Sequence, residues 1–186
     1  MRVRGLSVMP NETLKMDGDR TASGTISSSV VPELDITYFF TPNIAAELIL
    51  AVTPHDVRGA GSLSGADIGS VWLLPPTLTA QYHITQLAEW TGERALSKVK
   101  PYFGVGVNYT MFFNEDAGQF DSISYDNAFG IALQAGIDIE ITDGIYLNAD
   151  VKYIMMESDW SINNGAVTGS AEINPLIIGL GVGYRF

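Results

Sequence analysis

Residues 101–113 read PYFGVGVNYTMFF, and every second position in this stretch carries a bulky apolar side chain. The bulky positions are Phe103, Val105, Val107, Tyr109, Met111 and Phe113. The positions between them include Tyr102, Gly104, Gly106, Asn108 and Thr110. Because successive side chains of a strand point to opposite faces, this alternation predicts a long strand with one bulky apolar face and one small or polar face.

The same two-residue period recurs along most of the chain, whereas helical spacing is hard to find. It predicts eight strands, near residues 2–9, 32–40, 44–53, 75–84, 101–113, 129–141, 145–155 and 176–186. Strands of globular sheets usually have about five or six residues. These runs are longer and match the roughly nine to eleven residues that a tilted strand needs to cross a bilayer.

The connections between the predicted strands alternate in length. Long polar stretches, expected to be loops, cover residues 10–29, 54–70, 114–127 and 157–172. Short turns cover 41–43 and 142–144, and the connection 85–98 is longer than expected for the short side. Long loops on one rim, tight turns on the other and both chain ends on the short-turn side are typical of an outer-membrane β-barrel.

An eight-stranded antiparallel barrel can also be a water-soluble one, so the two faces must decide between them. The polar face here is rich in glycine, which suits the narrow interior of a small barrel better than a surface in water. The bulky face then points to lipid. The aromatic residues of that face fall at two levels, as interfacial anchors do: Tyr38, Phe40, Tyr82, Phe103, Tyr184 and Phe186 at the short-turn rim, and Tyr109, Phe113, Phe129 and Tyr153 at the other.

Composition narrows the class of protein further. The chain has 186 residues, of which 46% are hydrophobic and 17% charged, and this predicts a single folded domain over 1–186. The formal net charge of -11 argues against a nucleic-acid partner. The sequence contains no cysteine and no recognisable secretory signal, and no run approaches the roughly 18 apolar residues of a spanning helix.

Charged residues on the polar face predict an interior network of ion pairs, because charges enclosed in a barrel must find partners. We assign to it Glu47, Asp138, Glu140, Asp150, Lys152 and Arg185. This interpretation is preferred to a proton relay. His55, expected in a loop, and His83, expected to point inward, are too far apart in sequence to suggest a metal site. No cofactor is expected. No arrangement of nucleophile and base stands out, so an enzyme is not expected, and a barrel-embedded hydrolase or acyltransferase is only a third alternative.

Prolines gather near the long-loop ends of the predicted strands. Pro75 and Pro76 open one strand, and Pro32, Pro54 and Pro175 fall at the same level. Proline cannot donate to a strand ladder. The cluster therefore indicates either that the sheet ends there, above the membrane, or that the wall has a lateral opening at Pro75 and Pro76. Inward-facing side chains near this rim are candidates for an entry path: Ile49, Phe112, Ile154 and Met156.

Several segments together resemble the outer membrane protein W family over nearly the whole chain. They are LPPTLTAQY (74–82), KPYFGVGVNYTMFF (100–113), AGIDIEI (135–141), LNADVKY (147–153) and GVGYRF (181–186). The resemblance implies an eight-stranded barrel in the outer membrane of a Gram-negative bacterium, associated with passage of small hydrophobic compounds. It also implies that Tyr184 and Phe186 form the terminal signal read by the barrel-assembly machinery.

The sequence thus predicts a passive route for small hydrophobic solutes, with membrane lipid and lipopolysaccharide as its surroundings. The alternative is a structural or surface-interaction barrel with a closed lumen, whose long acidic loops bind ions, lipopolysaccharide or host molecules. Uptake of an apolar solute by reconstituted vesicles distinguishes the two.

Overall fold

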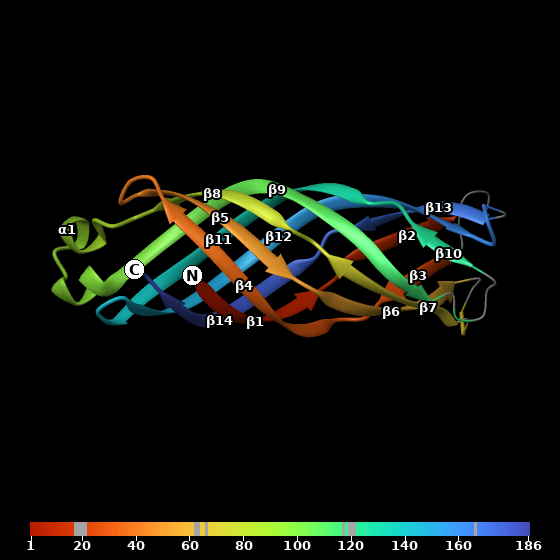
Figure 1. The fold of residues 1–186 in the computed structure, drawn as a ribbon, viewed down its shortest axis with the longest axis horizontal. Coiled ribbons are helices and arrows are strands. Elements are labelled where there is room, and N and C mark those ends of the chain that lie inside the picture. The colour runs from red at the N-terminus through yellow and green to blue at the C-terminus, as the bar shows by residue number, and fades with distance from the viewer. Residues whose placement is uncertain (17–21, 62–63, 66, 117, 119–121, 166) are drawn as a thin grey trace.

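The computed structural model describes residues 1–16, 22–61, 64–65, 67–116, 118, 122–165 and 167–186, which form an elongated antiparallel barrel (Figure 1). Its strands are β1 (Arg2–Met9), β2 (Glu12–Met16), β3 (Ala22–Ile26), β4 (Ser29–Phe39), β5 (Ile44–Ala51), β6 (Thr53–Gly61), β7 (Asp67–Leu74), β8 (Thr77–His83), β9 (Val99–Asp116), β10 (Ile123–Tyr125), β11 (Ala128–Thr142), β12 (Ile145–Ile162), β13 (Val167–Ile173) and β14 (Leu176–Tyr184). Its helices are α1 (Leu87–Thr91) and the 3-10 helix η1 (Arg94–Lys98).

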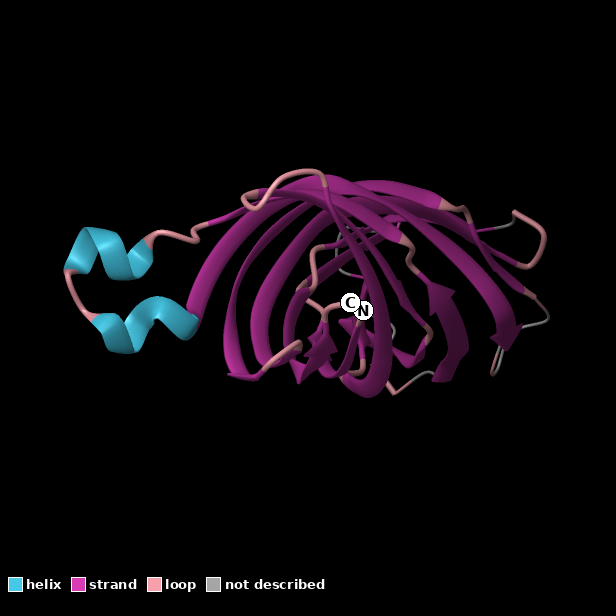
Figure 2. Ribbon diagram, turned by 60° about the vertical axis from the view of Figure 1, so that its left-hand side comes forward, coloured by secondary structure: helices cyan, strands magenta, loops and turns pink. Residues whose placement is uncertain are grey.

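Eight of these strands close into a ring. Each pairs antiparallel with the next in the order β1, β4, β5, β8, β9, β11, β12 and β14, and β14 pairs back to β1. Figure 2 shows the strands curving around the barrel axis. Closure leaves no strand edge unpaired around the ring, which a barrel in lipid requires. The predicted eight-stranded barrel is therefore confirmed.

The two faces of the ring are as the alternation predicts. Bulky side chains such as Val107, Ile131 and Leu180 are exposed on the outside, at 60%, 55% and 64% of their area. The small residues lie inside, where strands and side chains crowd together. A β-carbon added to Gly106 would lie 2.7 Å from the Cα of Thr79 on the neighbouring strand, so a side chain there has no room.

Both chain ends lie at the same end of the barrel as α1 (Figure 1). The tight turn between β11 and β12 also lies at this end of the two strands, and Gly144 adopts a positive φ of 76° in it, a conformation that favours glycine. Outward-facing aromatic rings pair at both rims. The pairs are Tyr38–Phe40, Tyr82–Phe103 and Tyr184–Phe186 at the short-turn end, and Tyr109–Phe129 and Trp72–Phe113 at the other.

The expectation of long polar loops is wrong for most of the described residues in those stretches. Segments β2, β3, β6, β7, β10 and β13 fill them, and β9 and β12 each continue through 18 residues. The sequence hides this extension because its outer face meets water and is polar, while its inner face buries residues such as Val57, Val71 and Ile162. Parts of the expected loops, at 17–21, 62–63, 66, 117, 119–121 and 166, lie outside the described residues.

The connection between β8 and β9 contains α1 and η1, which sequence periodicity did not predict. Each has five residues, too few for a helical period to show. None of the helices in the described part of the chain is long and apolar enough to cross a bilayer.

Candidate functional site

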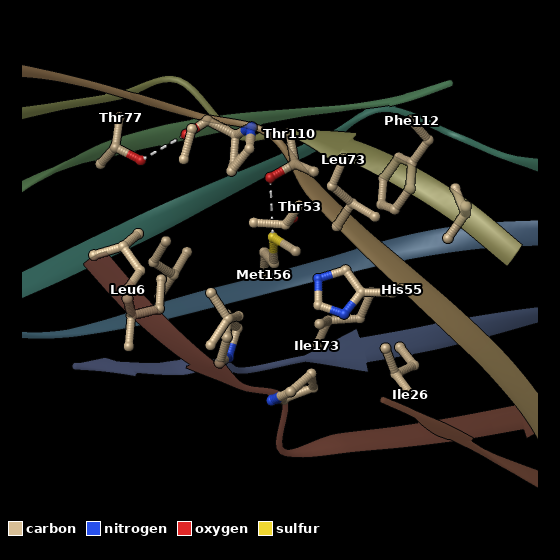
Figure 3. A pocket seen from close by; sticks show the side chains of 18 of the residues that line it. Leu6, Ile26, Thr53, His55, Leu73, Thr77, Thr110, Phe112, Met156 and Ile173 are labelled. Atoms are coloured by element: carbon tan, nitrogen blue, oxygen red, sulfur yellow. Dashed lines mark hydrogen bonds between the residues drawn. The ribbon is translucent and has the colours of Figure 1, made fainter. Parts of the chain in front are cut away.

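An apolar chamber of about 60 Å³ occupies the half of the barrel away from the chain ends. The four residues predicted to form an entry path, Ile49, Phe112, Ile154 and Met156, all line it. They come from β5, β9 and β12 and are joined by side chains of β1, β6, β7, β13 and β14 (Figure 3). Inward positions of distant strands are therefore brought together because closure of the ring turns all of them toward one axis.

The upper wall of the chamber carries few polar groups, and the hydroxyls of Thr77 and Thr110 have contacts within the wall. Thr110 Oγ1 lies 3.3 Å from Met156 Sδ, and Thr77 Oγ1 donates to the Pro75 carbonyl at 3.0 Å. Phe112 stacks on Tyr125 with ring centroids 5.5 Å apart. Burial raises the pKa of the Tyr125 phenol, and the carboxylate of Glu115 acts in the same direction. The phenol therefore stays neutral, and the upper chamber presents an uncharged surface.

His55 also faces the chamber, which corrects the expectation that it lies in a loop. It belongs to β6 and is buried, and its Nδ1 donates to the Ser27 carbonyl at 2.7 Å. A strand extended beyond the predicted barrel gives this histidine an inward position (Figure 3).

The floor of the chamber is charged. Lys152 Nζ lies 2.9 Å from both carboxylate oxygens of Glu33, and both residues line the chamber from below. Lys152 Nζ also lies 3.5 Å from Asp150 Oδ2. The change from an apolar wall to paired charges thus occurs within one cavity.

Below this floor, two arginines of β1 hold the carboxylates of four other strands. Arg2 pairs with Glu47 and, at 2.9 Å, with Asp138. Arg4 Nε lies 2.7 Å from an oxygen of Glu33 and 2.7 Å from an oxygen of Asp35. Arg4 Nη1 lies 3.0 Å from Asp150 Oδ2. These side chains are almost fully excluded from solvent.

Amide side chains complete this cluster, which we call the plug: Arg2, Arg4, Glu33, Asp35, Glu47, Asp138, Asp150 and Lys152, with Gln81 and Gln134. Gln81 and Gln134 donate to Glu47 Oε2 at 2.7 and 3.0 Å, and Gln134 donates to Asp150 at 3.0 Å. The plug contains five carboxylates and three cations, a formal excess of two negative charges. It lies between the two ends of the barrel, because Glu33 and Lys152 line the chamber while Asp138 lines a pocket at the short-turn mouth.

Of the six residues predicted as interior ion pairs, the structure places Glu47, Asp138, Asp150 and Lys152 in the plug. Glu140 and Arg185 lie elsewhere, at the short-turn mouth. Glu140 pairs with Lys100 at 3.1 Å where both are partly exposed, and the Arg185 guanidinium lies over the ring of Phe39 at 4.3 Å. Both residues are near strand ends, where the interior already meets water.

Sequence reasoning missed Arg2 and Arg4, the cations around which the plug is built. The signal was present, because Arg2, Arg4, Leu6 and Val8 alternate with Val3, Gly5 and Ser7. All four inward residues are buried. Their spacing could have identified them as inward residues of the first strand.

Prolines interrupt the strand ladders at the level of the chamber. Strand β5 pairs with β8, and further along the barrel β6 pairs with β7. Between the last pair of the first ladder, Ile49–Thr77, and the first pair of the second, Thr53–Leu73, the ladder breaks where Pro75 and Pro76 lie. On the β9 side the break is bridged, since Tyr109 N donates to the Pro76 carbonyl at 3.0 Å and Asn108 Nδ2 to the Pro75 carbonyl at 3.3 Å. Pro10 and Pro175 fall between β1–β14 and their extensions β2–β13.

Tyr184 and Phe186 lie together on the outside of the short-turn rim, with ring centroids 6.2 Å apart. Phe186 is 92% exposed. Both rings therefore face away from the plug.

Comparison with known proteins gives the same architecture. A model of the OmpW family matches residues 1–186. The uncharacterized outer-membrane protein y4mB of Sinorhizobium fredii is 43% identical over 100% of this chain and 79% of its own length. The dibenzothiophene metabolism operon protein PahQ of Pseudomonas aeruginosa is 28% identical over 92% of this chain and 79% of its own length. The crystal structure of the outer membrane protein OprG from Pseudomonas aeruginosa matches with a TM-score of 0.87 and 28% identity, over 100% of this chain and 93% of that chain.

Proposed function

The chain belongs to the OmpW family of outer-membrane β-barrels, and from this premise we propose that it is a passive route by which small hydrophobic molecules enter the outer membrane. The solute enters the chamber from the outer end of the barrel and leaves sideways into lipid. No cofactor and no covalent step take part.

The observation that carries the proposal is the position of the apolar chamber directly above the charged plug. Burying apolar surface contributes about 25 cal/mol per Å², so an apolar solute gains free energy on entering the chamber from water. Displacing the plug would separate buried ion pairs, which costs several kcal/mol for each charge left without a partner. The solute therefore has a favourable way in and no favourable way down the axis.

Lateral exit is the remaining path, and the ladder interruptions at the level of the chamber are the places where the wall is weakest. Pro75 and Pro76 form one such place, because neither can donate a ladder hydrogen bond. Exit at this height delivers the solute among the apolar chains of the outer leaflet. The name of PahQ, which refers to dibenzothiophene metabolism, suggests planar apolar aromatics as a solute class to test.

Uptake of such an aromatic into proteoliposomes tests the proposal. We expect the protein to accelerate uptake over protein-free vesicles, and Ile154→Trp, which fills the chamber, to abolish the acceleration. Leu133→Trp is the matched control, since Leu133 is 46% exposed on the outside of β11 and a tryptophan there faces lipid. Equal uptake by protein-free and wild-type vesicles would overturn the proposal.

Replacement of Pro75 and Pro76 by Thr and Val tests the exit at that point. An exit at Pro75 and Pro76 predicts slower uptake, because the restored donors can close the ladder. Unchanged uptake would move the exit to another interruption of the wall.

A surface-interaction role is the second candidate, supported by an acidic groove outside β10, β12 and β13 that includes Asp126, Glu157 and Asp159. In that role the barrel is a rigid support for binding ions, lipopolysaccharide or host molecules, with divalent cations between the carboxylates and the phosphates of lipopolysaccharide. Vesicles that take up no apolar solute, together with barrels that retain lipopolysaccharide, would favour it.

We further propose that Tyr184 and Phe186 are read by the barrel-assembly machinery before the ring closes. Their exposure on the outer rim leaves both rings accessible to such a partner.

A further inference from the structure

The wall between β11 and β12 contains a notch at the height of the chamber. The ladder pairs Gly130 with Met156 below it, and β10 pairs Tyr125 with Trp160 above it. Four residues, 126–129, therefore face three, 157–159. Among the described residues, the hydrogen bonds recorded across this stretch come from its upper end, from Asp126 N to Asp159 O at 2.9 Å and from Ser158 Oγ to Asp126 O at 2.7 Å.

The lower end of the notch is where β11 leaves β12. Ala128 and Phe129 pair with Thr110 and Tyr109 of β9, but no pair to β12 is recorded for either in the described chain. The ladder on the other side of β12 is irregular at the same height but is bridged, since Met156 pairs with Ile173 and Ile154 N donates to the Pro175 carbonyl at 3.2 Å. There Met156 N donates to the side chain of Asn174 at 3.2 Å, next to Pro175.

A groove on the outside of the barrel lies over this notch. It is lined by the lipid-facing side chains of Val107, Phe129, Ile131 and Met155, and Glu157 and Glu172 lie at its polar rim. Phe129 is 77% exposed and belongs to the upper aromatic rim. The apolar part of the groove therefore opens at the outer edge of the hydrocarbon layer.

Met156 lines both this groove and the chamber. It is 7% exposed, and its thioether lies 3.3 Å from Thr110 Oγ1 inside the barrel (Figure 3). Methionine is unbranched and has three rotatable side-chain bonds, so it can change shape at small cost. Its partner across the ladder is Gly130, where an added β-carbon would lie 3.0 Å from Met156 Cβ.

We propose that this notch is the outlet of the chamber, with Met156 as the movable side chain that closes it, and that a small apolar solute passes through it to the outer leaflet. The inference rests on the proposed function and assigns its exit to a place other than Pro75 and Pro76. Release of the thioether from Thr110 and its rotation beside Gly130 would open the path. The occupant is a small apolar molecule because the path is lined by apolar groups from the chamber to the groove.

Cysteine reactivity tests the connection without measuring transport. The chain has no cysteine, so single substitutions Met156→Cys, Ile154→Cys and Met155→Cys each give one reactive thiol. In proteoliposomes, each variant is treated with a charged water-soluble thiosulfonate or with a long-chain alkyl maleimide dissolved in the lipid, and labelling is measured by mass spectrometry. We expect Cys at 154 to react from water, Cys at 155 from lipid, and Cys at 156 from both.

Uptake measurements complete the test. We expect Met156→Trp and Gly130→Val to lower uptake of the apolar aromatic to the rate of protein-free vesicles, and Leu133→Trp, which faces lipid from β11 outside the groove, to leave it unchanged. Unboiled gel mobility shows that each variant is folded. Labelling at position 156 from water alone, with wild-type uptake by Met156→Trp, would overturn the notch as outlet while leaving the proposed function intact. Failure of wild-type uptake would instead remove the proposed function, while the labelling still reports whether the chamber and lipid are connected.

Discussion

Replacing Lys152 by methionine should destabilise the barrel far more than replacing Asp35 by asparagine. Lys152 Nζ contacts both oxygens of Glu33 at 2.9 Å, and Met keeps the length of the side chain but removes its charge. The formal excess of negative charge in the plug then rises from two to three. Leaving a buried charge without its partner typically costs about 3–5 kcal/mol, so we expect a loss of that size in the free energy of unfolding.

Asp35→Asn changes the charge in the opposite direction. Within the described residues Asp35 makes an ion pair with Arg4 but accepts no hydrogen bond. Arg4 keeps its contacts with Glu33 and Asp150. The lost ion pair and the relieved repulsion oppose each other, and we expect a net change within about 1 kcal/mol, the size of one ordinary hydrogen bond.

Urea unfolding in phosphatidylcholine vesicles, followed by tryptophan fluorescence and by the mobility of unboiled samples on gels, measures both changes. Val151→Met is the control for the methionine itself, because Val151 precedes Lys152 and faces lipid. If Asp35→Asn lowers the free energy of unfolding as much as Lys152→Met, excess negative charge in the plug does not control the stability of the barrel, and the reasoning fails.

Three further predictions concern packing, hydrogen bonding and assembly. Gly106→Ala should lose about 1–3 kcal/mol of stability, the usual cost of overpacking, because its β-carbon would meet Thr79; wild-type thermal stability on gels would contradict this. Tyr102→Phe removes the hydroxyl that accepts from Asn148 Nδ2 at 3.0 Å and should cost about 1 kcal/mol in the urea assay, whereas no change would show that the bond contributes nothing. Phe186→Ala should slow insertion by the assembly machinery in vesicles while leaving urea stability unchanged, and equal insertion rates would remove its role as a signal.

The barrel wall could be predicted because a strand in lipid repeats one simple rule along its whole length. Phe103 to Phe113 face outward at every second position, and neighbouring strands follow the same rule, so both the ring and its orientation follow from periodicity. The same rule placed Ile49, Ile154 and Met156 inside. Closure of the ring then brought them to one chamber, although no sequence feature links them.

Where the strands extend beyond the membrane, their two faces no longer differ clearly in apolar character, so the alternation is hard to see in the sequence. His55 lies on a strand whose outer face meets water and whose neighbours are polar, so its segment looks like a loop in the sequence. Arg2 and Arg4 are on a strand whose two faces differ little in apolar character. Only the assembled barrel shows that their guanidinium groups meet the carboxylates of other strands. Arg185 was predicted to point inside only because it falls on the inward positions of the alternating pattern. The strand ends there, and its side chain meets aromatic rings at the mouth.

The plug also has a consequence for the cell that carries the protein. The guanidinium, ammonium and carboxylate groups of the plug are interlocked and almost fully excluded from solvent, so we expect salts and hydrophilic antibiotics to cross it poorly. A bacterium can then insert many copies without making its envelope leaky. Electrical recordings that look for open pores will accordingly register little current, even where the barrel is abundant.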